Sequence, residues 1–150
     1  MALKFFRVSL MFVAMLSALG AQEKPKPKMM TAPGIRQPFS EADVYFVSGM
    51  IPHHAQAVLM AGWAPSHEAS ANIKLLCEPI RVSQTDETKW MQNWLNERGQ
   101  EVPDAKATHH KMKMGDMVHE MLMPGMLTDE EMAALGKARG KEWERTHAAQ

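Results

Sequence analysis

Histidine and methionine gather in two stretches of this 150-residue chain, and both side chains are metal ligands. The first stretch is MIPHHAQAVLM, residues 50–60, and the second is HHKMKMGDMVHEMLMPGM, residues 109–126. Thioether and imidazole groups together form the ligand set that suits Cu(I), and Ag(I) is similarly soft. Mg²⁺ and Ca²⁺ prefer oxygen ligands, and a structural zinc site usually needs more thiolates than the single Cys77 supplies. We therefore expect copper as the bound metal, as Cu(I) or Cu(II), with silver as a surrogate.

The spacing in the first stretch places its ligands on one face of a helix. At about 100° per residue, four of them share a stripe about 120° wide: Met50, His53, His54 and Met60. The same offsets on the following helix select Glu87 and Met91, so two helices are expected to face each other through these residues. Core packing is the alternative, with methionine filling gaps and histidine paired to Gln84 or Glu87.

The second stretch is richer, since nine of its eighteen residues are His or Met. A helix over residues 107–122, followed by an MPGM turn, would have two ligand stripes about 150° apart. One stripe contains His109, Met112, His119 and Met123, and the other contains His110, Met114, Met117 and Met121. A core needs only one apolar face, so the second stripe favours metal ligation. The alternative is a flexible methionine surface for a protein partner.

The first twenty residues predict export. Lys4 and Arg7 precede an apolar run from Val8 to Leu19, and small residues follow, which is typical of a signal peptide cleaved near Gly20. That run is too short to span a membrane, and no second apolar run follows it. The chain has 17 basic and 17 acidic residues, so loss of the two signal cations leaves a net charge of −2. We therefore expect a secreted or periplasmic protein with no membrane span and no nucleic-acid partner.

The rest of the chain has the pattern of a helical domain. Residues 21–39, which include EKPKPK, are expected to be a flexible linker, and residues 40–150 a helical metal-binding domain. Strand-like runs of β-branched residues are absent, which indicates an all-α fold. Helices are expected over residues 40–61, 66–98, 107–122 and 129–147. Capping boxes at Ser40 and Thr128 start the first and last of them. Their short connections favour an antiparallel bundle of three to four helices.

Four segments resemble domain-of-unknown-function family 305: MIPHH, QTDETKWMQNWL (residues 84–95), MPGMLTDEEMAAL (residues 123–135) and ARGKEW (residues 138–143). The resemblance implies an exported protein with a ferritin-like four-helix architecture that binds copper and silver through Met and His. It implies metal ligands at Met50, His53, His54, Met60 and Met91, and in the segment from His109 to Met126. Family members continue after the ARG block with a second M-I-x-H-H helix. This chain ends before one, so its fold is expected to lack that last part or to be completed in a homodimer.

These features predict a binding protein with no catalytic residues. It would sequester Cu(I) or hand it on in metal tolerance or homeostasis, with a copper exporter or chaperone as partner. A ferritin-like metal oxidase is the alternative among enzymes, but a di-iron site needs two E-x-x-H motifs and only Glu144 to His147 forms one. A metal-free helical module that binds a protein partner is the third interpretation.

Overall fold

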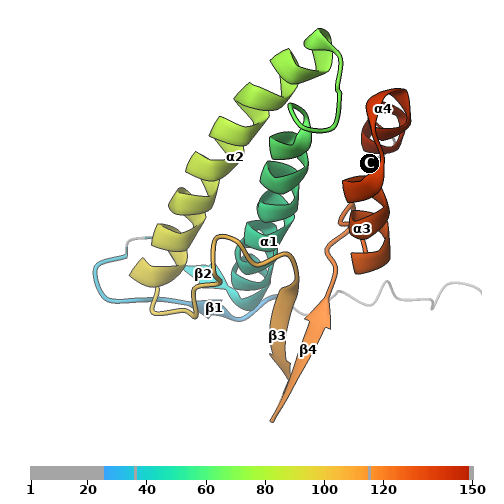
Figure 1. Cartoon of the computed structure of the whole chain (residues 1–150). Helices are drawn as coiled ribbons and strands as arrows, with labels where there is room; N and C mark the ends of the chain where they lie inside the picture. The colour runs from blue at the N-terminus through green and yellow to red at the C-terminus, as the bar shows by residue number, and fades with distance from the viewer. Residues whose placement is uncertain (1–25, 36, 115, 149–150) are drawn as a thin grey trace, which may run out of the picture.

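The computed structural model describes residues 26–35, 37–114 and 116–148 (Figure 1). The chain is largely helical, as expected, and its helices are α1 (Glu41–Trp63), α2 (Ala71–Glu97), α3 (Asp129–Lys137) and α4 (Gly140–Ala148). Among the described residues, no helix is long and apolar enough to cross a membrane. The predicted signal peptide lies outside the described ranges.

Two small antiparallel sheets accompany the helices. Strand β1 (Met29–Met30) pairs with β2 (Phe39–Ser40), and β3 (His110–Met114) pairs with β4 (Met117–Met121). Except for Ser40, the first sheet lies within residues 21–39, the range expected to be a flexible linker. Phe39, the first residue of β2, packs edge-on against Trp94, with ring centroids 5.8 Å apart. This contact holds the entry to α1 against the last turns of α2.

The prediction of a helix over residues 107–122 is wrong, because residues 110–121 form a β-hairpin. His or Met recurs at every second position of HKMKM and again in MVHEM, which is the period of a strand. The Gly-Asp dipeptide between the two runs is a hairpin signal. Charged residues fill three of the four alternate positions, the fourth being Val118, and Lys111 Nζ lies 3.5 Å from Glu120 Oε1 across the strands. The period-two signal therefore outweighs the helical offsets that the same residues also satisfy.

Both expected capping boxes are confirmed. Asp43 N–H donates to Ser40 Oγ at 3.3 Å, and Ser40 N–H donates to Asp43 Oδ2 at 2.7 Å. Thr128 and Glu131 exchange the same two bonds at the start of α3. Each box satisfies two amide groups that a helix N-terminus leaves without partners.

Two other helix boundaries differ from expectation. The last helix is broken, since α3 ends at Lys137 and α4 begins at Gly140. Gly140 has a φ of 54°, a left-handed conformation that favours glycine and interrupts a helix. Helix α2 begins at Ala71 rather than at residue 66, after a turn in which the His67 carbonyl accepts from Gly140 N–H at 2.8 Å. This hydrogen bond joins the break between α3 and α4 to the turn that precedes α2.

Helix α1 lies between α2 on one side and α3 with α4 on the other (Figure 1). Its contact with α2 buries one cluster: Val47, Ile51, Met91 and Leu95. A second cluster joins it to the C-terminal helices: Ala61, Ala64, Ala69, Cys77, Leu127, Leu135 and Trp143. Burial raises the pKa of the Cys77 thiol, which therefore stays protonated and packs as an apolar group.

Candidate metal centre

The ligand stripes of α1 and α2 face each other, and much of this face is core. His54 is 6% exposed, and its Nε2 lies 2.8 Å from Glu87 Oε2. Met91 is buried in the cluster between the helices, and Met50 packs against that cluster. Met60 packs against the second cluster. These residues therefore have the packing contacts and the histidine partner that the core-packing alternative expected.

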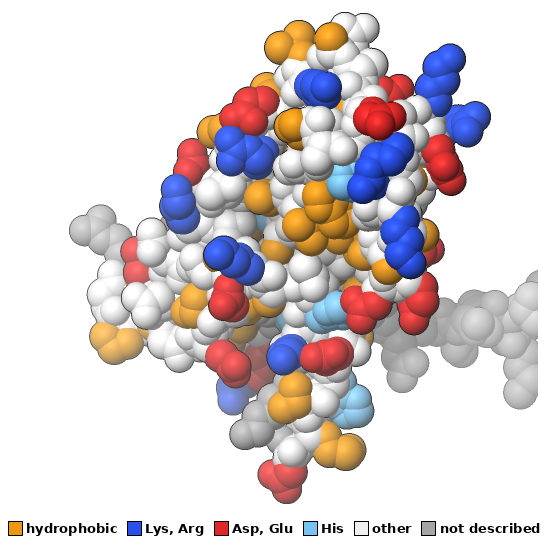
Figure 2. Space-filling view, viewed as in Figure 1, with side chains coloured by type: hydrophobic (Ala, Val, Ile, Leu, Met, Phe, Trp, Pro, Cys, Tyr) orange, Lys and Arg blue, Asp and Glu red, His pale blue; other side chains and the backbone are white. Residues whose placement is uncertain are grey.

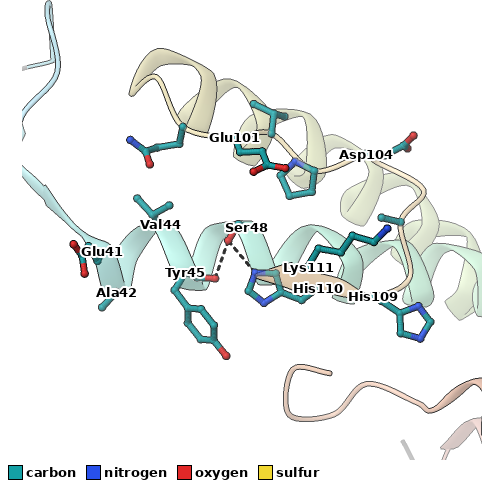
Figure 3. Close-up of a pocket in the computed structure, with 14 residues that line it drawn as sticks. Glu41, Ala42, Val44, Tyr45, Ser48, Glu101, Asp104, His109, His110 and Lys111 are labelled. Atoms are coloured by element: carbon teal, nitrogen blue, oxygen red, sulfur yellow. Dashed lines mark hydrogen bonds between the residues drawn. The ribbon is translucent and has the colours of Figure 1, made fainter. Parts of the chain in front are cut away.

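A different group forms where β3 meets the first half of α1. His110 is 2% exposed, and its ring centroid lies 5.1 Å from that of Tyr45. Its Nε2 lies 3.2 Å from Ser48 Oγ (Figure 3). Its Nδ1 is buried and has no hydrogen-bond partner in the described part of the chain. A buried imidazole nitrogen of this kind is a donor that a metal ion can use.

The surroundings of Gly49 show what His110 Nδ1 faces. A Cβ atom built on Gly49 would lie 3.1 Å from His110 Nδ1 and 2.6 Å from Met123 Sδ. The imidazole nitrogen and the thioether sulfur therefore border the same small space beside the α1 backbone. Met123 is only 8% exposed, so this space is shielded from solvent. An imidazole and a thioether are two donors of the soft-metal set, and they reach this space from separate segments.

The MPGM turn brings two more of the predicted residues to the same part of α1. A Cβ built on Gly125 would lie 3.5 Å from His53 Nε2, so the turn lies directly over the helix. Met126 Sδ accepts a hydrogen bond from the Met123 N–H at 3.2 Å. His53 Nδ1 is buried and, among the described residues, has no partner. The structure thus places His110 and Met123 beside Gly49 and the MPGM turn beside His53, one helical turn further along α1, while Met126 contacts Met123 within that turn.

The hairpin register orders the remaining candidate ligands of the segment. The paired positions are His110 with Met121, Met112 with His119, and Met114 with Met117. Directly opposite positions share a face of an antiparallel pair, and alternate positions take the other face. All six His and Met positions therefore lie on one face, with the buried His110 at its inner end. Figure 2 shows hydrophobic and histidine side chains together on the projecting hairpin, where Met117 is 64% exposed.

His109 is separate from this group. Its Nε2 lies 3.2 Å from Asp129 Oδ1, and its Nδ1 lies 3.3 Å from Thr108 Oγ1. It lines an open groove of about 760 Å³ between α1 and the loop before β3 (Figure 3). Carboxylates also line this groove: Glu41, Glu101 and Asp104. His109 thus lies beside the Asp129 carboxylate, whereas His110, which lines the same groove, has its Nδ1 at the buried space beside Met123.

Carboxylates do not gather into a metal site in the described residues. In that part of the chain, no three His, Cys, Asp or Glu side chains form a metal-binding group. Glu144, which begins the single E-x-x-H motif, accepts a hydrogen bond from the Ser70 N–H at 2.5 Å. Its carboxylate therefore satisfies an amide at the start of α2. The donors that do converge are imidazole and thioether groups.

Burial also sets the charge of the two histidines in the group. Desolvation lowers the pKa of His110, and it lowers the pKa of His53 together with a smaller repulsion from His54. Both effects disfavour the imidazolium form. Neutral imidazole is the form that binds metal, so these side chains are ready to bind at neutral pH.

Three residues of α1 that the spacing did not single out support this arrangement. Gln56 is 2% exposed, and its Nε2 donates to the carbonyls of Thr108 at 3.0 Å and Leu127 at 2.9 Å. Its Oε1 accepts from the Leu127 N–H at 2.9 Å. Gln56 therefore joins both ends of the hairpin-and-turn segment to α1, while Ser48 contacts His110 and Gly49 leaves the space beside it. The sequence signal that could have identified Gln56 was its position, as a polar residue, at the edge of the stripe of candidate ligands on α1.

The fold and this site define a largely helical protein with a group of His and Met side chains between its first helix and a hairpin. The chain belongs to the family described as Domain of unknown function (DUF305), whose model matches residues 43–150, as the four sequence segments predicted. The uncharacterized protein L153 of Acanthamoeba polyphaga mimivirus is 38% identical to it over 56 residues. That match covers 37% of each of the two chains. No solved structure matches the chain.

Proposed function

We propose that this chain is an exported protein that binds Cu(I), or Ag(I) in its place, and sequesters the ion or hands it on. The observation that carries the proposal is the approach of His110 Nδ1 and Met123 Sδ to one space beside Gly49. His110 and Met123 would hold the ion, with His53 and Met126 as further donors from the same part of the fold. Thioether and neutral imidazole suit a soft ion.

The charge of the site supports a monovalent ion. The four donor side chains are uncharged when their imidazoles are neutral, so they leave the charge of a bound ion uncompensated. Both His110 and Met123 are buried. The cost of burying an ion rises steeply with its charge, which penalises Zn²⁺ or Cu²⁺ more than Cu(I). Softness and charge therefore favour the same ion.

The hairpin would collect the ion for the buried site. Its His and Met face begins at the exposed Met117 and ends at the buried His110. Thioethers do not titrate and stay available in solvent, so an ion could be received there from solution or exchanged with a copper exporter or chaperone. This role explains why the methionines of a surface hairpin share one face, while two lysines, a glutamate and Val118 take the other.

Cu(I) is expected to bind this chain more tightly than Zn²⁺ does, because two of the four proposed donors are thioethers. Competition with a chromophoric Cu(I) chelator measures the first affinity, and competition with a zinc indicator measures the second. Ag(I) should displace Cu(I), whereas Zn²⁺ should not. Zinc binding of equal or greater strength would contradict a soft site, and absence of binding by either ion would favour the protein-partner interpretation.

We propose further that the ferritin-like four-helix bundle is made by two copies of the chain. Helix α2 exposes a second set of apolar side chains, with Leu75 75%, Leu76 61%, Val82 49% and Trp90 63% exposed. At about 100° per residue this set lies roughly opposite the buried Cys77 and Met91. Packing of two α2 helices through it would place four helices side by side. Sedimentation equilibrium should show a dimer that Trp90→Glu converts to a monomer, and a monomeric parent chain would rule the assembly out.

A further inference from the structure

We propose that Ser48 selects the ring nitrogen with which His110 binds metal, and that Gly49 keeps the space at that nitrogen open. Neither residue is a metal ligand, and both lie on α1 just before the MIPHH motif. The inference rests on the proposed function, since it concerns how the chain prepares His110 for a soft ion. Its first test is made on the metal-free chain, so it does not depend on metal binding.

The Ser48 hydroxyl has a single proton to donate. Its Oγ lies 3.1 Å from the Tyr45 carbonyl oxygen, one turn back along α1, and 3.2 Å from His110 Nε2 (Figure 3). A carbonyl oxygen can only accept, so Ser48 donates to Tyr45 and accepts from the His110 Nε2–H. In a neutral imidazole the other nitrogen then carries a lone pair. That nitrogen is Nδ1, which faces Met123.

The opposite tautomer is unfavourable at both ring nitrogens. It would place an N–H on His110 Nδ1, where the described residues offer no hydrogen-bond acceptor. Buried N–H groups without partners are rarer in proteins than acceptors with an unused lone pair. It would also require the Ser48 proton to leave the Tyr45 carbonyl for Nε2. Histidines that bind metal generally donate their other ring N–H to a protein group, which fixes the ring, and Ser48 offers such a group here.

Gly49 contributes by lacking a side chain. A Cβ at this position would lie 2.6 Å from Met123 Sδ and 3.0 Å from Met123 Cγ. Alanine would therefore push the thioether away from His110 Nδ1 and fill the space that the two donors border. Glycine is unfavourable within a helix, and this position is buried in the middle of α1. The need for space at His110 explains why glycine stands there.

Nitrogen NMR of the His110 ring in the metal-free, ¹⁵N-labelled chain tests the tautomer directly. At about pH 8 the imidazole is neutral, since the ordinary pKa of histidine is about 6.5. The His110 signals are those lost in His110→Gln. We expect a protonated Nε2 and an unprotonated Nδ1. A protonated Nδ1 would overturn the proposal, whatever metal the chain binds.

Cu(I) competition titrations test the consequence for binding. Ser48→Ala should lower the affinity of the tightest site about 10- to 100-fold, the range found for groups that orient metal ligands. Ser48→Thr keeps a hydroxyl and should bind almost as the parent does. Ser83→Ala is the matched control, because Ser83 Oγ donates to the Ile80 carbonyl at 3.4 Å in the same way on an exposed part of α2. Equal affinities for Ser48→Ala and Ser83→Ala would overturn the role of Ser48.

The glycine is tested by Gly49→Ala, which should weaken Cu(I) binding by a similar factor while the His110 tautomer stays unchanged. Unchanged affinity would overturn the role of Gly49. Circular dichroism and denaturant unfolding show whether each variant is folded, and alanine favours a helix at both positions. A parent chain that binds no Cu(I) would end the proposed function, and the NMR result would still decide whether Ser48 sets the tautomer.

Discussion

Replacement of Gln56 by leucine should lower the free energy of unfolding by about 3 kcal/mol, although leucine is a better apolar group for a buried helix position. The variant loses three hydrogen bonds, to the Thr108 carbonyl and to both backbone groups of Leu127. Leaving a buried polar group without its partner costs about 1–3 kcal/mol. The gain from the apolar side chain offsets only part of that loss.

Urea unfolding followed by circular dichroism measures this change, with Gln92→Leu as the control. Gln92 lies on α2, where its Nε2 donates a hydrogen bond to the Pro103 carbonyl at 2.9 Å. Its replacement should cost about 1 kcal/mol. Amide exchange in β3 and β4 should also become faster in Gln56→Leu than in Gln92→Leu, because Gln56 holds both ends of their segment. Equal losses in the two variants would contradict this role of Gln56.

Replacement of His110 by phenylalanine together with Met123 by leucine should weaken the tightest Cu(I) site at least about a hundredfold, since changes to groups that only orient ligands already cost up to this factor. Both substitutions remove a donor atom and keep an apolar side chain of similar shape. Leucine and methionine are close in volume, so the core around Met123 should repack at small cost. The measurement is competition with a Cu(I) chelator of known affinity.

The control for this variant is Met117→Leu with Met121→Leu on the hairpin. Both methionines are exposed, at 64% and 37%, so the folded core does not depend on them. This pair should reduce the number of Cu(I) ions bound and leave the tightest dissociation constant nearly unchanged. If the hairpin pair weakens the tightest site as much as the double variant at His110 and Met123, the buried space beside Gly49 is not the principal site.

Features that depend on neighbouring residues were predictable from the sequence. The capping boxes at Ser40 and Thr128 require groups only three residues apart, and both form as expected. The facing of α1 and α2 follows from helical periodicity, and it brings His54 to Glu87. The family was predictable too, because its motifs are short and contiguous. Each of these signals lies within a short segment, so it can be read without knowing where the rest of the chain folds.

The hairpin was not predictable with the same ease, because the second His/Met stretch satisfies two periods at once. Its His and Met residues recur at offsets of two, which suits strands, and at offsets of three, four and seven, which suits a helix. Local propensity does not separate these alternatives for so short a segment. The tertiary contacts favour the hairpin, since Gln56 binds Thr108 before β3 and Leu127 after β4, and His110 packs against α1.

The sequence by itself determined which ligand types this protein can offer: imidazole and thioether groups in two stretches, with a single thiol. Only the tertiary structure decided how each of them is used. Met60 and Met91 meet apolar neighbours and pack as core, whereas Met123 meets the buried His110 nitrogen beside a glycine. The physical reason is that a thioether is both an apolar group and a soft ligand. Its role is set by the atoms that surround it, and segments distant in the chain supply those atoms.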